Sequence, residues 1–167
     1  MNLILCGMMG AGKTTVGAEI SRLTGRRLCD TDTLITERYG KISDIFRDKG
    51  EAYFRNLETE TVKELARQDG LIISTGGGLV MKEENVTLLK NSGKIVFLRA
   101  KVETLLQRLQ ADTTRPLLQT GGETLQERLT RLLTERAPTY ARVADYTVDV
   151  DGKTTKEIAK EIMLLIQ

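Results

Sequence analysis

The hydrophobic residues of this chain gather in short continuous runs that are separated by longer, more polar stretches. Residues 2–6, 71–75 and 94–98 read NLILC, LIIST and KIVFL, with few polar positions inside them. Runs of this length and composition are typical of strands that are buried on both faces of a sheet. RLCD at 27–30 and DYTVDV at 145–150 are weaker runs of the same kind, and they complete the set of predicted strands.

The segments between these runs have helical patterns, and glycine follows several of them. Gly25, Gly40 and Gly50 each stand where a helix should stop, because glycine readily adopts the conformation that ends a helix. The predicted helices cover 13–23, 33–39, 51–67, 82–90, 102–109 and 124–135, with a short one capped by Ser43 and a last one opened by Thr154 or Thr155. Regular alternation of strands and helices predicts a single α/β domain over residues 1–167, with a parallel sheet covered on both faces.

Composition narrows the class of protein. Of the 167 residues, 40% are apolar and 29% are charged, which is the balance of an ordinary globular domain. The net charge of +2, without a Lys/Arg-rich tract, argues against a nucleic-acid partner. The apolar run at the N-terminus is too short for a membrane span and has no basic segment before it, as a signal peptide would. With two cysteines outside any metal-binding spacing, we expect free thiols and a cytoplasmic protein.

The chain contains no histidine, and this limits the chemistry that it can perform. Histidine is the usual general base, the usual activator of a nucleophile and a common metal ligand. Any reaction must therefore depend on carboxylates, lysine, arginine, backbone amides or a hard cation.

The segment GMMGAGKT, residues 7–14, fits the pattern G-x-x-x-x-G-K-[ST] and lies between the first predicted strand and the first predicted helix. In that context the pattern is typical of a P-loop, whose glycines let backbone N–H groups turn toward phosphate oxygens. Lys13, which we expect to face solvent until nucleotide binds, adds a positive charge, and the Thr14 hydroxyl suits Mg²⁺. The chain is therefore predicted to bind a nucleoside triphosphate.

A P-loop alone does not identify the reaction, since GTPases, motor proteins, transport ATPases and small-molecule kinases share it. The sequence has no Asn-Lys-x-Asp segment for reading guanine, and the predicted strand 71–75 ends in Thr75 and three glycines rather than in a carboxylate. These features favour a kinase for a small acceptor, which needs a second pocket in the crevice at the carboxyl ends of the strands.

Polar residues suited to such a pocket follow the predicted strands. Asp30 and Asp32 lie in CDTD, and in an extended segment both would face the crevice while Thr31 turns aside. Arg55 and Glu58 are three residues apart in a predicted helix and should pair, by themselves as an ordinary solvated ion pair.

Glycine and arginine supply the remaining candidates. The glycines at 76–78 follow a buried strand and suit a backbone that approaches a ligand closely. Arg115, in TTRPLL, lies in a polar segment where a mobile lid could carry it over the phosphates. Arg136 lies near the predicted end of a helix, just before Pro138.

Taken together, GMMGAGKTT, DTD, FR..E, GGG, RPLL and ER...Y, in this order and spacing, resemble shikimate kinase over nearly the whole chain. The resemblance implies a three-layer P-loop kinase fold like that of the nucleoside monophosphate kinases, with a five-stranded parallel sheet in the order 2-3-1-4-5. It also implies a lid at about 111–123 and a substrate-binding helical region. The implied reaction is phosphorylation of the 3-hydroxyl of shikimate by ATP with Mg²⁺, in the pathway to chorismate and the aromatic amino acids.

The resemblance further implies roles for individual residues, in an enzyme that we expect to be a monomer without a nucleic-acid or membrane partner. The implied ATP-binding residues are Gly10, Ala11, Gly12, Lys13, Thr14, Thr15, Arg108, Arg115 and Lys153. The implied shikimate-binding residues are Asp32, Arg55, Gly76, Gly77, Gly78 and Arg136. Lys13, Asp32 and Arg115 are implied to be catalytic, and Thr14 and Asp30 to serve the metal.

The chemistry of these side chains suits that substrate, which carries a carboxylate and hydroxyls. Arg55 and Arg136 could each hold the carboxylate with two parallel hydrogen bonds. An ionised Asp32 could accept from two hydroxyls and is the evident acceptor for the hydroxyl proton in a chain without histidine. We expect Asp30 to act on Mg²⁺ through metal-bound water.

Two alternatives stay open at this point. Another sugar-acid kinase, such as a gluconate kinase, would share the P-loop and would also need residues that bind an anion. A nucleotide-sensing module would bind ATP without acceptor-dependent release of ADP. The FR..E and GGG segments argue against the first alternative, and the presence of Asp32, Arg55 and Arg136 argues against the second.

Overall fold

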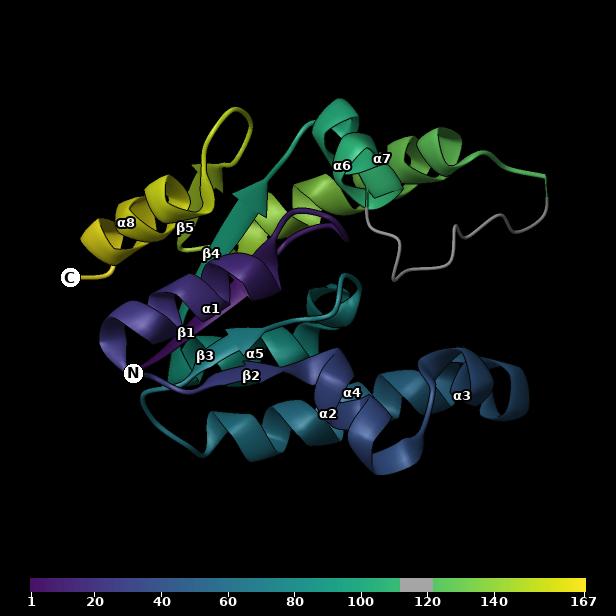
Figure 1. Ribbon diagram of the computed structural model, residues 1–167. Coiled ribbons are helices and arrows are strands. Elements are labelled where there is room, and N and C mark those ends of the chain that lie inside the picture. The colour runs from purple at the N-terminus through teal and green to yellow at the C-terminus, as the bar shows by residue number, and fades with distance from the viewer. Residues whose placement is uncertain (112–121) are drawn as a thin grey trace.

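The computed structural model describes residues 1–111 and 122–167, which fold around a parallel sheet (Figure 1). The strands are β1 (Asn2–Cys6), β2 (Leu28–Asp30), β3 (Ile72–Ser74), β4 (Gly93–Arg99) and β5 (Tyr146–Asp149). They lie in the order β2-β3-β1-β4-β5, and every neighbouring pair is parallel. The predicted α/β class and the implied strand order are therefore confirmed, and the carboxyl ends of all these strands meet at one edge.

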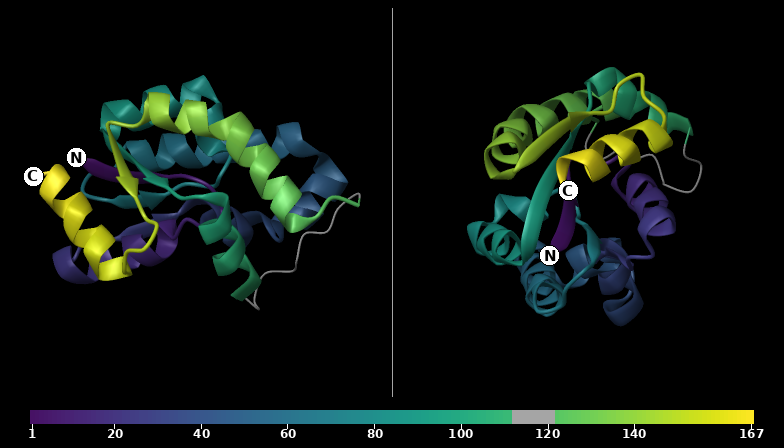
Figure 2. Two further views of the ribbon diagram at one scale, coloured as in Figure 1. Left: turned by 90° about the horizontal axis from the view of Figure 1, so that it is seen from above. Right: turned by 90° about the vertical axis from the view of Figure 1, so that its left-hand side faces the viewer.

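Helices cover both faces of the sheet, which gives three layers (Figure 2). The helices are α1 (Lys13–Thr24), α2 (Thr31–Tyr39), α3 (Ile42–Lys49), α4 (Glu51–Ala66), α5 (Glu83–Ser92), α6 (Val102–Ala111), α7 (Leu125–Val143) and α8 (Thr155–Leu165), with a 3₁₀ turn η1 (Leu79–Met81). Helices α1 and α8 pack on one face, and α5 and α7 pack on the other.

The main core forms where the central strands are apolar on both faces. Ile73 of β3, Ile4 of β1 and Ile95 of β4 are paired in register across these strands, and each is fully buried. Burial of such side chains stabilises the domain by about 1.5–3 kcal/mol each. The core thus holds in place the strand ends that carry the P-loop and the glycines at 76–78.

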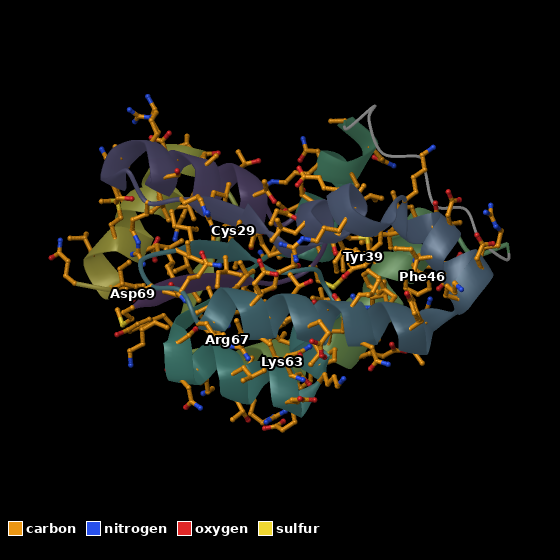
Figure 3. The ribbon with its side chains drawn as sticks, turned by 90° about the horizontal axis from the view of Figure 1, so that it is seen from below. Cys29, Tyr39, Phe46, Lys63, Arg67 and Asp69 are labelled. Atoms are coloured by element: carbon orange, nitrogen blue, oxygen red, sulfur yellow. The ribbon has the colours of Figure 1, made fainter. Side chains whose placement is uncertain are left out.

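A second, smaller hydrophobic cluster joins α2, α3 and α4. It is built from Ile35, Ile45, Phe54 and Leu57, and it is separate from the main core. Figure 3 shows Phe46, which is partly exposed and lies 4.9 Å from Phe54 between ring centroids, on this side of the molecule. These three helices therefore form a unit beside the sheet, and α4 of that unit carries Arg55.

Several predicted helix ends are wrong, because local sequence does not reveal which residues the tertiary structure places in the first turn. Helix α2 begins at Thr31 rather than Thr33, with Asp30 as its N-cap. Helix α3 begins at Ile42 after Lys41, so Ser43 lies inside the helix and does not cap it. The Thr154 cap of α8 is confirmed, and its side chain forms a capping box with Glu157.

Helix α7 runs through Pro138 to Val143, so the predicted end at Glu135 is also wrong. Proline has no N–H, and the Thr134 carbonyl therefore receives no helical hydrogen bond from residue 138. Burial of Tyr140 and Val143 against the sheet compensates for that loss and keeps the chain helical. As a result Arg136 lies well inside a long helix.

Most of the expected lid at 111–123, including Arg115, lies outside the described residues. Within the parts that the structure describes, no helix is both long enough and apolar enough to cross a membrane.

The first residue of β4 gives a test of the sheet. A Cβ atom at Gly93 would overlap the backbone carbonyl of its register partner Asn2 on β1. Gly93→Ala should therefore push the two strands apart and lower the free energy of unfolding by about 3 kcal/mol. Urea denaturation measures this. Lys94→Ala, at an exposed neighbouring position, should stay within about 0.5 kcal/mol of the parent, and equal losses in both variants would contradict the steric explanation.

Candidate active site

A cavity of about 420 Å³ opens at the carboxyl edge of the sheet. The P-loop forms one wall of it, and Asp30, Asp32, Ser74 and the first two glycines of the 76–78 segment form another. Residues from α6 and α8 complete the lining. Parallel strands of this fold class bind their ligands at this edge, so the cavity is the candidate active site.

The P-loop takes a backbone conformation that depends on its glycines. Gly10 and Gly12 have φ angles of 82° and 94°, in the region that side chains with a Cβ rarely adopt. The loop leads directly into the N-terminus of α1, whose free N–H groups and helix dipole favour a bound anion. This geometry suits a phosphate group.

Lys13 is partly exposed, and its ammonium group folds back onto its own loop. It donates hydrogen bonds to the carbonyl oxygens of Gly7, at 2.7 Å, and Met8, at 3.0 Å. These carbonyls hold the end of the side chain in place. Lys13 still lines the cavity, so its side chain is within the site that a nucleotide would enter.

The Thr14 hydroxyl lies between two polar side chains from neighbouring strand ends. It donates to Asp30 Oδ2 at 2.6 Å, and its oxygen lies 3.1 Å from the hydroxyl of Ser74. Because Asp30 and Ser74 are register partners on β2 and β3, the sheet itself brings these residues together. Sequence reasoning missed Ser74, although a polar residue near the end of the apolar run LIIST was a signal that could have identified it.

Asp30 and Asp32 are not arranged as an extended segment would arrange them. Asp30 Oδ1 caps α2 by accepting from the Thr33 amide at 3.0 Å, and Asp32 lies in the first turn of that helix. Thr31 between them is buried, and its hydroxyl accepts from the Gly76 amide at 2.9 Å. Both aspartates line the cavity and Thr31 is not among its lining residues, as expected, but a helix cap and first turn, rather than an extended segment, bring this about.

At each glycine of the 76–78 segment, a polar side chain lies close to the position that a Cβ atom would occupy. A Cβ at Gly76 would lie 2.8 Å from Asp32 Oδ1, and one at Gly78 would lie 2.7 Å from a guanidinium nitrogen of Arg55. Gly77 faces Arg136 in the same way, at 3.1 Å. The glycines thus bring together three polar side chains that sequence reasoning had singled out, from α2, α4 and α7.

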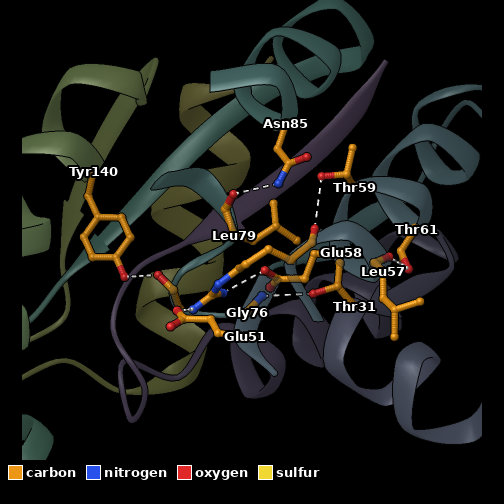
Figure 4. Close-up of polar contacts among 12 residues, drawn as sticks. Thr31, Glu51, Leu57, Glu58, Thr59, Thr61, Gly76, Leu79, Asn85 and Tyr140 are labelled. Carbon is orange, nitrogen blue, oxygen red and sulfur yellow. Dashed lines mark hydrogen bonds and ion pairs between the residues drawn. The ribbon is translucent and has the colours of Figure 1, made fainter. Parts of the chain in front are cut away.

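Arg55 is held by acidic side chains of its own helix. It donates to Glu58 Oε1 at 2.7 Å and to Glu51 Oε1 at 3.3 Å (Figure 4). Glu58 is 1% exposed, so the pair is not the solvated surface pair that its spacing alone favoured. Burial raises the pKa of the Glu58 carboxyl, and the pairing with Arg55 acts in the opposite direction. Removing Arg55 would leave the buried Glu58 without its hydrogen-bonded counterion.

The two remaining predicted ATP contacts differ in position. Arg108 of α6 lines the cavity and donates to the carbonyl oxygen of Ala11 at 2.8 Å, so it rests on the P-loop. Lys153 pairs with Glu161 at 2.7 Å. It is not among the described residues that line the cavity. Thr155 and Ile158, at the start of α8, do line it, although no sequence motif pointed to them.

Comparison with known proteins agrees with this geometry. The chain matches the family model for shikimate kinase over residues 9–167. It is 40% identical to the shikimate kinase of Sulfurihydrogenibium sp. (strain YO3AOP1), over 99% of this chain and 98% of that protein. It is 41% identical to the shikimate kinase of Geobacter sulfurreducens, over 99% of this chain and 91% of that protein.

Solved structures give the same result. The shikimate kinase from Acinetobacter baumannii in complex with shikimate is 40% identical, with a TM-score of 0.90 over 99% of this chain and 92% of that one. A deoxyadenosine kinase from M. mycoides with bound dATP, at 20% identity and a TM-score of 0.65, shares the fold, and the match covers 100% of both chains. On the family model and the full-length relatives, the chain belongs to the shikimate kinase family.

Proposed function

We propose that this protein transfers the γ-phosphoryl group of ATP to the 3-hydroxyl of shikimate, giving shikimate 3-phosphate and ADP on the way to chorismate and the aromatic amino acids. The observation that carries the proposal is the position of Asp32, Arg55 and Arg136 against successive glycines of one loop, beside a P-loop. That arrangement offers a carboxylate for hydroxyls and guanidinium groups for a carboxylate, next to a phosphate site.

The nucleotide would bind with its phosphates on the P-loop. Backbone N–H groups of residues 10–15 and the N-terminus of α1 would surround the phosphate oxygens. Lys13 would exchange its bonds to the Gly7 and Met8 carbonyls for bonds to the phosphates. Arg108, which already rests on the loop, would contact the nucleotide, and Lys153 would need to leave Glu161 to do so.

Thr14 and Asp30 would hold Mg²⁺ at this site. Their oxygens lie 2.6 Å apart and both residues line the cavity, which is a donor set that suits a hard cation. Among the described residues no group of three or more acidic or cysteine side chains could hold a metal unaided, which fits an ion that shares its coordination with water and phosphate. When bound, Mg²⁺ would neutralise charge on the phosphate oxygens.

Shikimate would bind between α2, α4 and α7. Arg55 and Arg136 would hold its carboxylate, and amides of the glycines at 76–78 would approach it from the loop. Asp32 would accept hydrogen bonds from the hydroxyls and take the proton of the hydroxyl that attacks. Arg115, which lies outside the described residues, would complete the charge stabilisation from the lid. Because a single chain supplies all of these groups, we further propose a monomer, and the free thiols of Cys6 and Cys29 support a cytoplasmic location.

The reaction itself is the first test. With MgATP, the purified protein should release ADP at a rate that depends on shikimate and is unchanged by gluconate, because the arginines and Asp32 are arranged for one acceptor. A coupled ADP-release assay with each acid measures this. Turnover with gluconate alone would support another sugar-acid kinase, and ATP binding without acceptor-dependent turnover would support a nucleotide sensor.

A second prediction separates the two aspartates. Asp32→Asn keeps the shape of the side chain but removes the proton acceptor, so kcat should fall roughly 10²–10⁴-fold and added Mg²⁺ should not restore it. Asp30→Asn should raise the Mg²⁺ concentration needed for half-maximal rate and recover part of its activity at high Mg²⁺. Titrating Mg²⁺ against both variants is the measurement. Rescue of Asp32→Asn alone would reverse the two assignments.

A third prediction concerns the planar guanidinium group of Arg55. Arg55→Lys keeps the charge near Glu58 but cannot form parallel hydrogen bonds to a carboxylate. The KM for shikimate should rise about 10- to 100-fold, the equivalent of one lost charge-assisted hydrogen bond, while the KM for ATP changes little. Arg47→Lys, at an exposed position on α3, serves as the matched control. A parallel rise in both KM values would place Arg55 outside the acceptor site.

A further inference from the structure

Tyr140 connects the middle of α7 to the loop at the edge of the sheet. Its ring is fully buried, and its hydroxyl donates a hydrogen bond to the carbonyl oxygen of Gly77 (Figure 4). The ring stacks on Phe97 of β4 with centroids 5.1 Å apart. The packing fixes where the ring lies, and the hydroxyl adds one specific contact to the glycine loop.

That contact restricts the backbone conformation of the loop at 76–78, which its glycines would otherwise leave free to vary. Glycines without a Cβ can adopt many backbone conformations, so the direction of each peptide group needs an external restraint. In a trans peptide the N–H of the next residue points opposite to the carbonyl. A bond that holds the Gly77 carbonyl therefore also holds the direction of the Gly78 amide.

Gly77 meets a second side chain from the same helix. Arg136 lies one turn before Tyr140, and residues four apart share a face of a helix. Its guanidinium nitrogen lies 3.1 Å from the position of a Cβ on Gly77. Arg136 thus contacts the loop at Gly77. The distance between Arg136 and the loop depends on how firmly α7 is held against Gly77.

Pro138 makes this attachment more important. It removes the backbone hydrogen bond to the Thr134 carbonyl, in the turn that contains Arg136. The helix by itself is therefore less rigid at this turn. The bond from Tyr140 to the loop supplies a restraint just beyond that turn.

Burial keeps the Tyr140 hydroxyl protonated. It raises the pKa of the phenol to about 12, and the nearby positive charge of Arg136 acts in the opposite direction. The hydroxyl is a hydrogen-bond donor at neutral pH, as for any tyrosine, and burial extends this form, which the Gly77 carbonyl requires, to higher pH.

We propose that Tyr140 is a positioning residue for the acceptor site. By holding the Gly77 carbonyl, it fixes the position of the glycine loop relative to Arg136. The loop amides and the Arg136 guanidinium are then spaced to bind the carboxylate of one acceptor molecule. The proposal rests on the proposed function for the identity of the ligand. It assigns Tyr140 no contact with the substrate.

The variant that tests this is Tyr140→Phe, which keeps the ring and removes only the hydroxyl. The KM for shikimate should rise about tenfold, the usual effect of losing one hydrogen bond, while kcat and the KM for ATP stay within about twofold. Tyr39→Phe removes a hydroxyl from an exposed ring on α2 and should change nothing (Figure 3). Val143→Ala loosens the packing of α7 without removing Tyr140 or its ring partner Phe97, and it should leave the KM for shikimate largely unchanged.

A double-mutant cycle shows whether the effect passes through Arg136. In an Arg136→Lys background, Tyr140→Phe should raise the KM for shikimate much less than it does in the parent, because the contact to be positioned is already impaired. A KM in the double variant that rises by the product of the two single-variant factors would overturn the positioning role. So would an unchanged KM in Tyr140→Phe, or an equal rise in Val143→Ala.

A measurement without substrate separates this proposal from the proposed function. Hydrogen exchange at the amides of residues 77–79 in the ligand-free protein should be about tenfold faster in Tyr140→Phe, with exchange in β1 unchanged. Faster exchange in a protein that did not act on shikimate would refute the function and keep the restraint on the loop. Unchanged exchange in an active enzyme would refute the restraint and keep the function.

Discussion

The close approach of charged side chains to Gly76, Gly77 and Gly78 is the constraint on which the site depends. Asp32, Arg55 and Arg136 each occupy space within 3.1 Å of the place where a Cβ would stand. Any larger residue in this loop would push at least one of them aside. The loop therefore sets the distance between these side chains of α2, α4 and α7.

Two positive side chains near the site already have partners within the protein. Lys13 is held by carbonyl oxygens of its own loop, and Arg55 is held by Glu58, which is buried. The Glu58 partner keeps the long, flexible Arg55 side chain in place, so less of its conformational entropy is lost when a ligand arrives. The cost is the burial of a carboxylate, and it is acceptable only because the pair is hydrogen-bonded.

The sheet and the small helical unit have different parts in this arrangement. The register of β2 with β3 aligns Asp30 with Ser74, and both meet Thr14 at the head of α1. The α2–α4 unit, with its own hydrophobic cluster, carries Arg55. Helix α7 approaches from the opposite face of the loop through its hydrogen bond to Gly77. A P-loop held at the edge of the sheet thus lies beside a glycine loop that is contacted by separately packed elements.

The sequence by itself determined the class of fold, the P-loop and the residue types available for chemistry, because these depend on local features: continuous apolar runs, glycine spacing and the lack of histidine. Resemblance added the strand order and an expected role for each candidate site residue. Tertiary structure decided that Asp30 caps a helix, that α7 continues through Pro138, that Glu58 is buried, and that Ser74 meets Thr14. The reason is physical: each of these outcomes depends on strand register and helix packing between residues far apart in the chain, and a local pattern carries no information about such contacts.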